Sequence, residues 1–182
     1  MKPVNIYILT ILVYGVLDII LQKNSKSIVV SKSRDRTYLP VILTFILNLT
    51  VLPFEAKMFH KSISPLMIFT GVVLCVAATI IRTKGQLDLK KGFSTRIEVQ
   101  NDHKLINTGL YSMIRHPLYL AILVLLLGAN IMLKAWFSWI FMLLNSLALY
   151  VRIDKEEQYL RENLPGYREY MKNTWRLIPG VY

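Results

Sequence analysis

The sequence predicts an all-α integral membrane protein with about five transmembrane helices and a helical cytoplasmic C-terminal tail. Three observations support this fold class. Of the 182 residues, 54% are hydrophobic, and the mean hydropathy is positive at +0.42. The hydrophobic residues form long blocks that are nearly free of charge. The lysines and arginines gather between alternate blocks, as they do in membrane proteins with a fixed orientation.

Five apolar blocks run along the chain, at 4–21, 39–54, 64–81, 117–133 and 135–151. A helix needs roughly 20 apolar residues to cross a bilayer, with about 17 as the lower end. The second block, 39–54, is long enough to span the bilayer only if residues on either side of it extend the helix. The first is followed by no small-x-small cleavage site, so we expect a retained span and not a cleaved signal peptide. Residues 1–182 are thus predicted to form a single membrane domain.

The net charge of +11 agrees with this topology. Five spans place 22–38, 82–116 and 152–182 on one side of the membrane, and these segments hold 18 of the 22 lysines and arginines. The positive-inside rule then puts the N-terminus outside and the C-terminus in the cytoplasm. Such a cationic surface faces anionic lipid headgroups, so we expect membrane lipids and no nucleic acid as partners.

The sequence also argues against a metal or a dinucleotide cofactor. Cys75 is the only cysteine, and His60, His103 and His116 show no metal-ligand spacing. The eight glycines never occur as Gly-x-Gly, so the dinucleotide-binding fingerprint is missing.

The segments 82–116 and 152–182 are too polar to span the membrane and lie on the cytoplasmic side in this topology, so we expect chemistry that needs water to take place there. In the second of these, Leu-Pro-Gly at 164–166 predicts a helix break followed by a short helix over 167–172.

The first candidate site is Arg115-His116-Pro117-x-Tyr119 at the start of the fourth block. Proline suits the first turn of a helix, where its missing N–H costs nothing. His116 would then lie at the positive end of the helix dipole, where free backbone N–H groups can bind a carboxylate or a similar acceptor. The alternative is that Arg115 is only a cationic anchor at the membrane surface and that His116 only fills the position before the helix.

The second candidate site is the pair Arg152 and Glu156, which share one face of a helix because they are four residues apart. They form either a weak ion pair or a functional pair, in which Arg152 holds a substrate carboxylate through two hydrogen bonds. Glu156 would then bind a cationic or hydroxyl-rich cofactor. We expect three further glutamates to be solvated: Glu157, Glu162 and Glu169. Asp18 is either functional or simply close enough to the surface to reach water.

Tyrosines are frequent in and around both cytoplasmic segments, at Tyr111, Tyr119, Tyr150, Tyr159, Tyr167 and Tyr170. Most are expected to lie in the interfacial aromatic belt. One or two of them are candidates to face a sulfonium cation.

Three stretches, GLYSMIRHPLYL, RIDKEEQYL and LPGYREYMKNTWRLIP, resemble the isoprenylcysteine carboxyl methyltransferase family of integral membrane enzymes, from about Gln100 to the C-terminus. The resemblance implies a cytoplasmic pocket for S-adenosylmethionine, and it implies Arg152 as the substrate-side arginine. The residues that match cofactor contacts of the family are Gln100, His103, Lys104, Leu105, Ile106, Tyr111, His116, Pro117, Leu118, Tyr119 and Glu156. The chain has LPGY where many members have Phe-Gly with a tyrosine three residues further on, so Tyr167 and Tyr170 receive no role.

The implied reaction is S-adenosylmethionine-dependent methylation of the C-terminal carboxylate of a prenylated cysteine or a similar lipidic carboxylate. Three alternatives stay open. Phospholipid amine N-methyltransferases share the RHPxY motif, but an amine acceptor is not helped by a neighbouring cation such as Arg152. Membrane sterol reductases have a similar hairpin but are much longer. A protein without catalytic activity would use its polar ends only as anchors.

Overall fold

The computed structural model describes residues 2–23, 29–32, 36–59, 62–89, 98–100 and 105–181. The long helices are α1 (Pro3–Lys23), α2 (Tyr38–Met58), α3 (Pro65–Leu89), α4 (Pro117–Met132) and α5 (Ser138–Asn163). The shorter elements are β1 (Val29–Lys32), β2 (Glu98–Gln100), the 3-10 helix η2 (Gly109–Ser112) and α6 (Tyr167–Lys172). The helical fold predicted from the apolar blocks is therefore confirmed.

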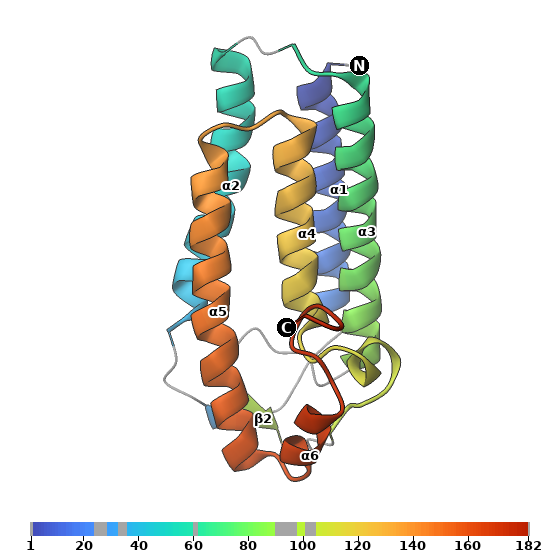
Figure 1. The fold of residues 1–182 in the computed structure, drawn as a ribbon, viewed down its shortest axis with the longest axis vertical. Helices are drawn as coiled ribbons and strands as arrows, with labels where there is room; N and C mark the ends of the chain where they lie inside the picture. Colours follow the sequence, from blue (N-terminus) through green and yellow to red (C-terminus); the bar gives the residue numbers. More distant parts are fainter. Residues whose placement is uncertain are drawn as a thin grey trace.

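The long helices run side by side along the long axis of the molecule (Figure 1). Helix α4 packs against α3, and α2 packs against α5. The N-terminus and the α4–α5 turn lie at one end, and α6 lies at the other (Figure 1). Glycines bring α3 and α4 close together, because a Cβ on Gly71 would lie 2.6 Å from the carbonyl oxygen of Gly128. Small residues at such crossings are common where membrane helices pack tightly.

Within the described residues, three helices are long and apolar enough to cross a membrane: Pro3–Gln22, Tyr38–Met58 and Pro65–Leu89. Helix α4 is apolar but has only 16 residues. Helix α5 continues without a break from its apolar first half into the charged stretch that ends at Asn163. The count of five spans therefore stays a prediction.

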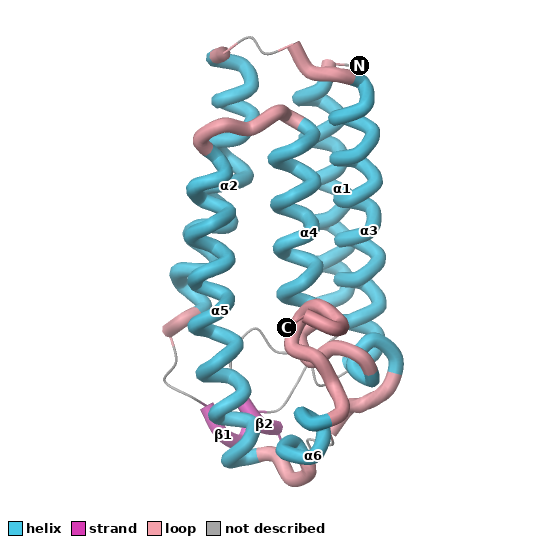
Figure 2. Tube along the Cα trace, in the orientation of Figure 1, coloured by secondary structure: helices cyan, strands magenta, loops and turns pink. Residues whose placement is uncertain are grey.

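Two short strands accompany the helices, and the fold class remains all-α. Strands β1 and β2 form a two-stranded antiparallel sheet, with Val29 opposite Gln100 and Lys32 opposite Glu98 (Figure 2). The pairing of β1 with β2 was not predicted. Strands this short carry little periodic signal, and their pairing depends on contacts distant in sequence.

The N-terminus of α5, at the end of the molecule opposite α6, is held by a buried carboxylate from α2. Glu55 accepts hydrogen bonds from the backbone N–H of Trp136 and from Ser138, at 3.1 Å from its N–H and 2.8 Å from its hydroxyl. Asn48 also donates to the Ser138 carbonyl at 2.7 Å. A carboxylate suits this position because the first N–H groups of a helix lack partners within the helix.

Asp18 pairs with side chains of α3 and of its own helix. It accepts from Arg82 Nε at 2.7 Å, from Gln86 at 2.6 Å and from Gln22 at 2.6 Å. These contacts join α1 to α3. They give this carboxylate a structural role, which the position of Asp18 in the sequence did not predict.

Candidate active site

The two predicted residues on α5 meet through a third side chain from α4. The Tyr119 hydroxyl accepts a hydrogen bond from Arg152 Nε at 2.8 Å and donates one to Glu156 Oε2 at 2.6 Å. Arg152 and Glu156 do share one face of α5, as their spacing predicted. The Tyr119 hydroxyl lies between them, so the arrangement is more than a surface ion pair.

Arg152 is also oriented by the start of α2. Its Nη1 lies 3.3 Å from the Thr37 hydroxyl, and its guanidinium carbon lies 5.8 Å from the centre of the Tyr119 ring. Only 4% of Arg152 is exposed. The plane of the guanidinium is thus fixed by contacts from two other helices. Thr37 was not among the predicted residues, because nothing in its local sequence connects it with Arg152.

Tyrosines surround Glu156, and several of them are buried instead of lying in an interfacial belt. Burial and the nearby charge of Glu156 raise the pKa of Tyr111. Burial and the charges of Glu157 and Glu156 raise the pKa of Tyr167. Tyr170 is buried too, and its hydroxyl donates to the Tyr111 carbonyl at 2.6 Å. The belt interpretation is therefore wrong for these three side chains.

Glu157 is fully buried, which corrects the prediction that it is solvated. Its carboxylate accepts from Arg115 Nε at 2.7 Å, from His116 Nε2 at 3.2 Å and from Arg176 Nε at 2.9 Å. One residue further along a helix turns a side chain by about 100°. Glu157 therefore points toward the start of α4 and the C-terminal tail, while its neighbour Glu156 points toward Tyr119. Arg115 is half-buried in the same cluster, which overturns the view of it as a membrane anchor only.

The Glu157 cluster predicts a sensitivity to acid. Burial raises the pKa of Glu157, but the hydrogen bonds and charges of His116 and Arg115 outweigh burial and lower it from 4.5 to about 2. Because the folded-state pKa is the lower one, the ionised carboxylate stabilises the fold above about pH 4.5, and this contribution disappears as the pH falls toward 2. Its size at neutral pH is on the order of 3 kcal/mol.

We therefore expect the Tm of the wild type in detergent to fall more steeply between about pH 5 and pH 3 than the Tm of Glu157→Gln. A thermal melt at each pH measures this difference. Parallel curves for the two proteins would show that Glu157 does not titrate in this way.

The start of α4 follows the prediction closely. Pro117 is the first residue of the helix, and His116 directly precedes it. The His116 ring is 5% exposed and stacks on the Tyr119 ring, with centroids 5.5 Å apart. Pro117 and Leu118 pack toward α3, where a Cβ on Gly85 would lie 2.7 Å from Leu118 Cδ2. The structure thus brings His116 and Tyr119 together with Glu156, and it directs Pro117 and Leu118 elsewhere.

The remaining predicted cofactor residues precede η2. His103 and Lys104 lie outside the described residues, and only the backbone of Gln100 is described, in β2. Ile106 is half-buried. Leu105 packs against Leu164, Tyr167 and Tyr170.

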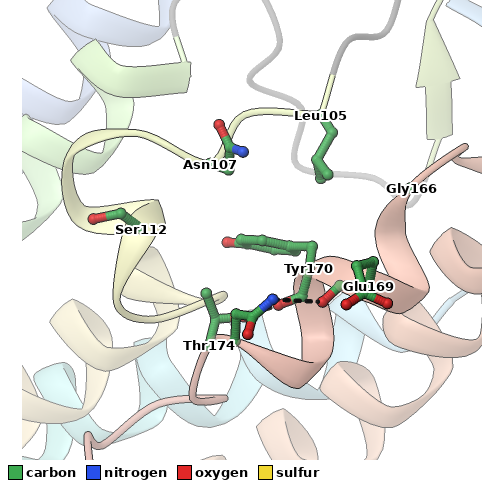
Figure 3. A pocket seen from close by; sticks show the side chains of 8 residues that line it. Leu105, Asn107, Ser112, Gly166, Glu169, Tyr170 and Thr174 are labelled. Atoms are coloured by element: carbon green, nitrogen blue, oxygen red, sulfur yellow. Dashed lines mark hydrogen bonds between the residues drawn. The ribbon is translucent and has the colours of Figure 1, made fainter.

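Leu105 also lines a cavity of about 300 Å³ between the tail and the segment that contains η2 (Figure 3). The other lining residues are Asn107, Ser112, Gly166, Glu169, Tyr170, Asn173 and Thr174. Leu105 is the one predicted cofactor residue among them. In Figure 3 the Tyr170 side chain points from α6 toward the segment that carries Asn107 and Ser112. The cavity is thus separate from the Tyr119–Glu156 cluster.

Comparison with known proteins gives a consistent family assignment. Residues 71–162 match the isoprenylcysteine carboxyl methyltransferase family. The chain is 27% identical over 125 residues to a protein-S-isoprenylcysteine O-methyltransferase of Dictyostelium discoideum, covering 63% of this chain and 50% of that protein. It is 26% identical over 178 residues to protein-S-isoprenylcysteine O-methyltransferase B of Arabidopsis thaliana, covering 96% of this chain and 84% of that protein.

A probable protein-S-isoprenylcysteine O-methyltransferase of Oryza sativa subsp. indica is 30% identical over 117 residues, which covers 62% of this chain. The chain spans 50% of the length of the Dictyostelium relative and 61% of the rice relative. The matched region contains α4, most of α5, and with them Tyr119, Arg152 and Glu156. The protein therefore belongs to the isoprenylcysteine carboxyl methyltransferase family.

Proposed function

We propose that the protein transfers a methyl group from S-adenosylmethionine to the C-terminal carboxylate of a prenylated cysteine, or to a similar lipidic carboxylate. The observation that carries the proposal is the set Arg152–Tyr119–Glu156 at the polar end of the bundle. The buried guanidinium of Arg152 suits a carboxylate acceptor. The Tyr119 hydroxyl links this cation to the Glu156 carboxylate through two hydrogen bonds. Family membership and the names of the relatives support the same reaction.

The residues near Glu156 fit a sulfonium cofactor that also carries hydroxyl groups. The Glu156 carboxylate accepts hydrogen bonds from hydroxyl or ammonium groups, and it is half-buried. Aromatic rings attract cations that lie over their faces, and Tyr111 and Tyr119 both lie close to Glu156. S-adenosylmethionine, when bound, supplies an electrophilic methyl group on its sulfur. Glu156, Tyr111, Tyr119 and His116 are the described side chains that we propose to hold it.

Arg152 is proposed to bind and orient the acceptor carboxylate. A carboxylate is already ionised at neutral pH, so it would need no general base to accept the methyl group, and S-adenosylhomocysteine would leave as the product. The protein then has to align the two reactants and keep water away, which accounts for much of the rate of such reactions. Tyr119 and Thr37 fix the guanidinium before the acceptor arrives, so little reorganisation is needed at that moment.

A lipid-linked acceptor is consistent with a site at the end of apolar helices. The tail of the acceptor would lie among the helices, and its polar head would reach Arg152 from the bilayer. We propose that this end faces the cytoplasm and that the N-terminus lies outside, because most lysines and arginines belong to the segments at this end. Protease access to a C-terminal tag from the cytoplasmic side tests the orientation.

The direct test is transfer of a labelled methyl group from S-adenosylmethionine to a farnesylated cysteine analogue in detergent. We expect a base-labile label, as a methyl ester gives, and no label when the carboxyl group of the analogue is amidated. Phosphatidylethanolamine serves as the competing acceptor. A base-stable label on that lipid would replace the proposal with N-methylation of a phospholipid amine.

A further inference from the structure

Glu157 lies next to the proposed site but does not face it. It is 0% exposed, and its three donors, Arg115, His116 and Arg176, come from the start of α4 and from the C-terminal tail. A buried carboxylate with three charged or polar donors holds those donors strongly, because its own desolvation would otherwise be unfavourable. Glu157 therefore fastens two separate segments to α5.

The backbone of the tail follows the start of α4 in the same region. Trp175 donates to the Met113 carbonyl at 3.0 Å, and its own carbonyl accepts from Arg115 N at 2.8 Å. His116 N donates to the Arg176 carbonyl at 3.1 Å. We name residues 173–177 the C-terminal strap. Arg115, which donates to Glu157 through Nε, also donates from Nη1 to the Thr174 carbonyl in the strap. Arg176 in the strap contacts Asp154 Oδ1 at 3.3 Å as well as Glu157. The charges that surround Glu157 therefore link the strap both to α5 and to the start of α4.

The strap and Glu157 together determine the position of His116. The backbone N–H of His116 is bonded to the strap, and its Nε2 is bonded to Glu157. The ring, held at both points, stacks on Tyr119 with an interplanar angle of 15°. The Tyr119 hydroxyl in turn lies between Arg152 and Glu156. A continuous set of contacts thus leads from Glu157 to the proposed cofactor site.

We propose that Glu157 is a positioning residue for this site: it clasps the C-terminal strap to the start of α4 and thereby holds His116 against Tyr119 for cofactor binding. The proposal rests on the proposed function for its last step, cofactor binding. Its first step, the clasp itself, is independent of that function.

Glu55 provides a matched control that tests whether Glu157 has only a structural role. Glu55 is also a buried glutamate that contacts α5, but it lies at the opposite end of the helix and caps its N-terminus. Glu55→Gln and Glu157→Gln both neutralise a buried carboxylate that accepts several hydrogen bonds. A general loss of stability should affect both variants alike, whereas the clasp predicts effects on the strap and on the ligand for Glu157→Gln alone.

The experiment measures two quantities in detergent: hydrogen exchange of peptides that cover 113–116 and 173–177, and the Kd of S-adenosylhomocysteine. For Glu157→Gln we expect exchange in both peptides to become at least about tenfold faster and the Kd to rise about tenfold, as loss of a charged hydrogen bond implies. For Glu55→Gln we expect a lower Tm with unchanged exchange in these peptides and an unchanged Kd. Arg176→Gln, which opens the clasp from the strap side, should reproduce the effect of Glu157→Gln if that variant fails to fold.

Unchanged exchange in both Glu157→Gln and Arg176→Gln would overturn the clasp. Equal effects of Glu55→Gln would overturn it too, because they would show a general loss of stability. Faster exchange with an unchanged Kd would overturn the link to the cofactor. If the wild type itself does not bind S-adenosylhomocysteine, the proposed function fails and the link to the cofactor falls with it, while the exchange data still decide the clasp.

Discussion

Replacing Arg152 by alanine is expected to lower kcat/KM for methyl transfer roughly 10²- to 10³-fold, the usual effect of removing one preorganised electrostatic donor. The Kd of S-adenosylhomocysteine should change far less, because Glu156 and the aromatic rings stay in place. The loss should therefore appear with the acceptor, as a lower kcat together with a higher KM for the farnesylated substrate.

The structure makes Arg152→Lys an informative companion variant. Lysine keeps the positive charge but has no planar fork, and it cannot contact Tyr119 and Thr37 through separate nitrogens as Arg152 does. We expect an activity between those of the wild type and Arg152→Ala. Arg161→Ala removes an exposed arginine from the same helix and should leave the kinetics unchanged.

Steady-state rates with the labelled cofactor and a Kd for S-adenosylhomocysteine separate the outcomes. An unaffected rate in Arg152→Ala would mean that another group holds the acceptor. A Kd that rises as much as the rate falls would mean that Arg152 acts mainly through Tyr119 on the cofactor side. The proposed role requires a lower rate of methyl transfer to the acceptor together with a nearly unchanged Kd of S-adenosylhomocysteine.

The long helices could be predicted because the bilayer leaves the backbone few alternatives. An apolar run that enters the hydrocarbon region has to satisfy its own N–H and C=O groups, and a helix does so within the segment. The end of α5 was predictable for a local reason as well: Gly166 adopts a φ of +81°, which glycine tolerates easily, directly before α6. Strand β1 was missed, since its four residues pair with a segment about seventy residues away.

The candidate site was predictable only in part. The spacing of Arg152 and Glu156 is sufficient to put both on one face of α5. Local sequence singles out Tyr119 but not its contact with Arg152, and it gives no signal for Thr37, which reaches Arg152 from the start of α2. That juxtaposition depends on how α2 and α4 pack against α5.

Glu157 is different, because a signal for its burial was present and was not used. The buried positions of α5 include Asn145, Leu149, Arg152 and Ile153, and Glu157 continues their spacing of three and four residues. The prediction treated it by residue type, as a charged side chain that prefers water. Helix phase was the better guide, since Arg115 and Arg176 provide the partners that make burial of the charge favourable.

Neutralising Glu156 is expected to have the second-largest effect. Glu156→Gln keeps the shape of the side chain and retains an oxygen that can accept from Tyr119. It removes the negative charge that we propose to bind the cofactor. Because a hydrogen bond to a charged group contributes about 1.5–3 kcal/mol, the Kd of S-adenosylhomocysteine should rise roughly 10- to 100-fold. The KM for S-adenosylmethionine should rise in parallel, with a smaller change in the KM for the acceptor.

Glu162→Gln is the matched control, since Glu162 is an exposed glutamate on the same helix and no contact of the proposed site involves it. Isothermal titration with S-adenosylhomocysteine measures the affinity of each variant. If Glu156→Gln binds as tightly as the wild type, the carboxylate does not contact the cofactor, and its hydrogen bond with Tyr119 would serve only to orient that ring. A higher KM for the acceptor alone would instead move Glu156 to the substrate side. In that case a cationic head group on the acceptor would explain the requirement for a carboxylate better than a prenylcysteine does.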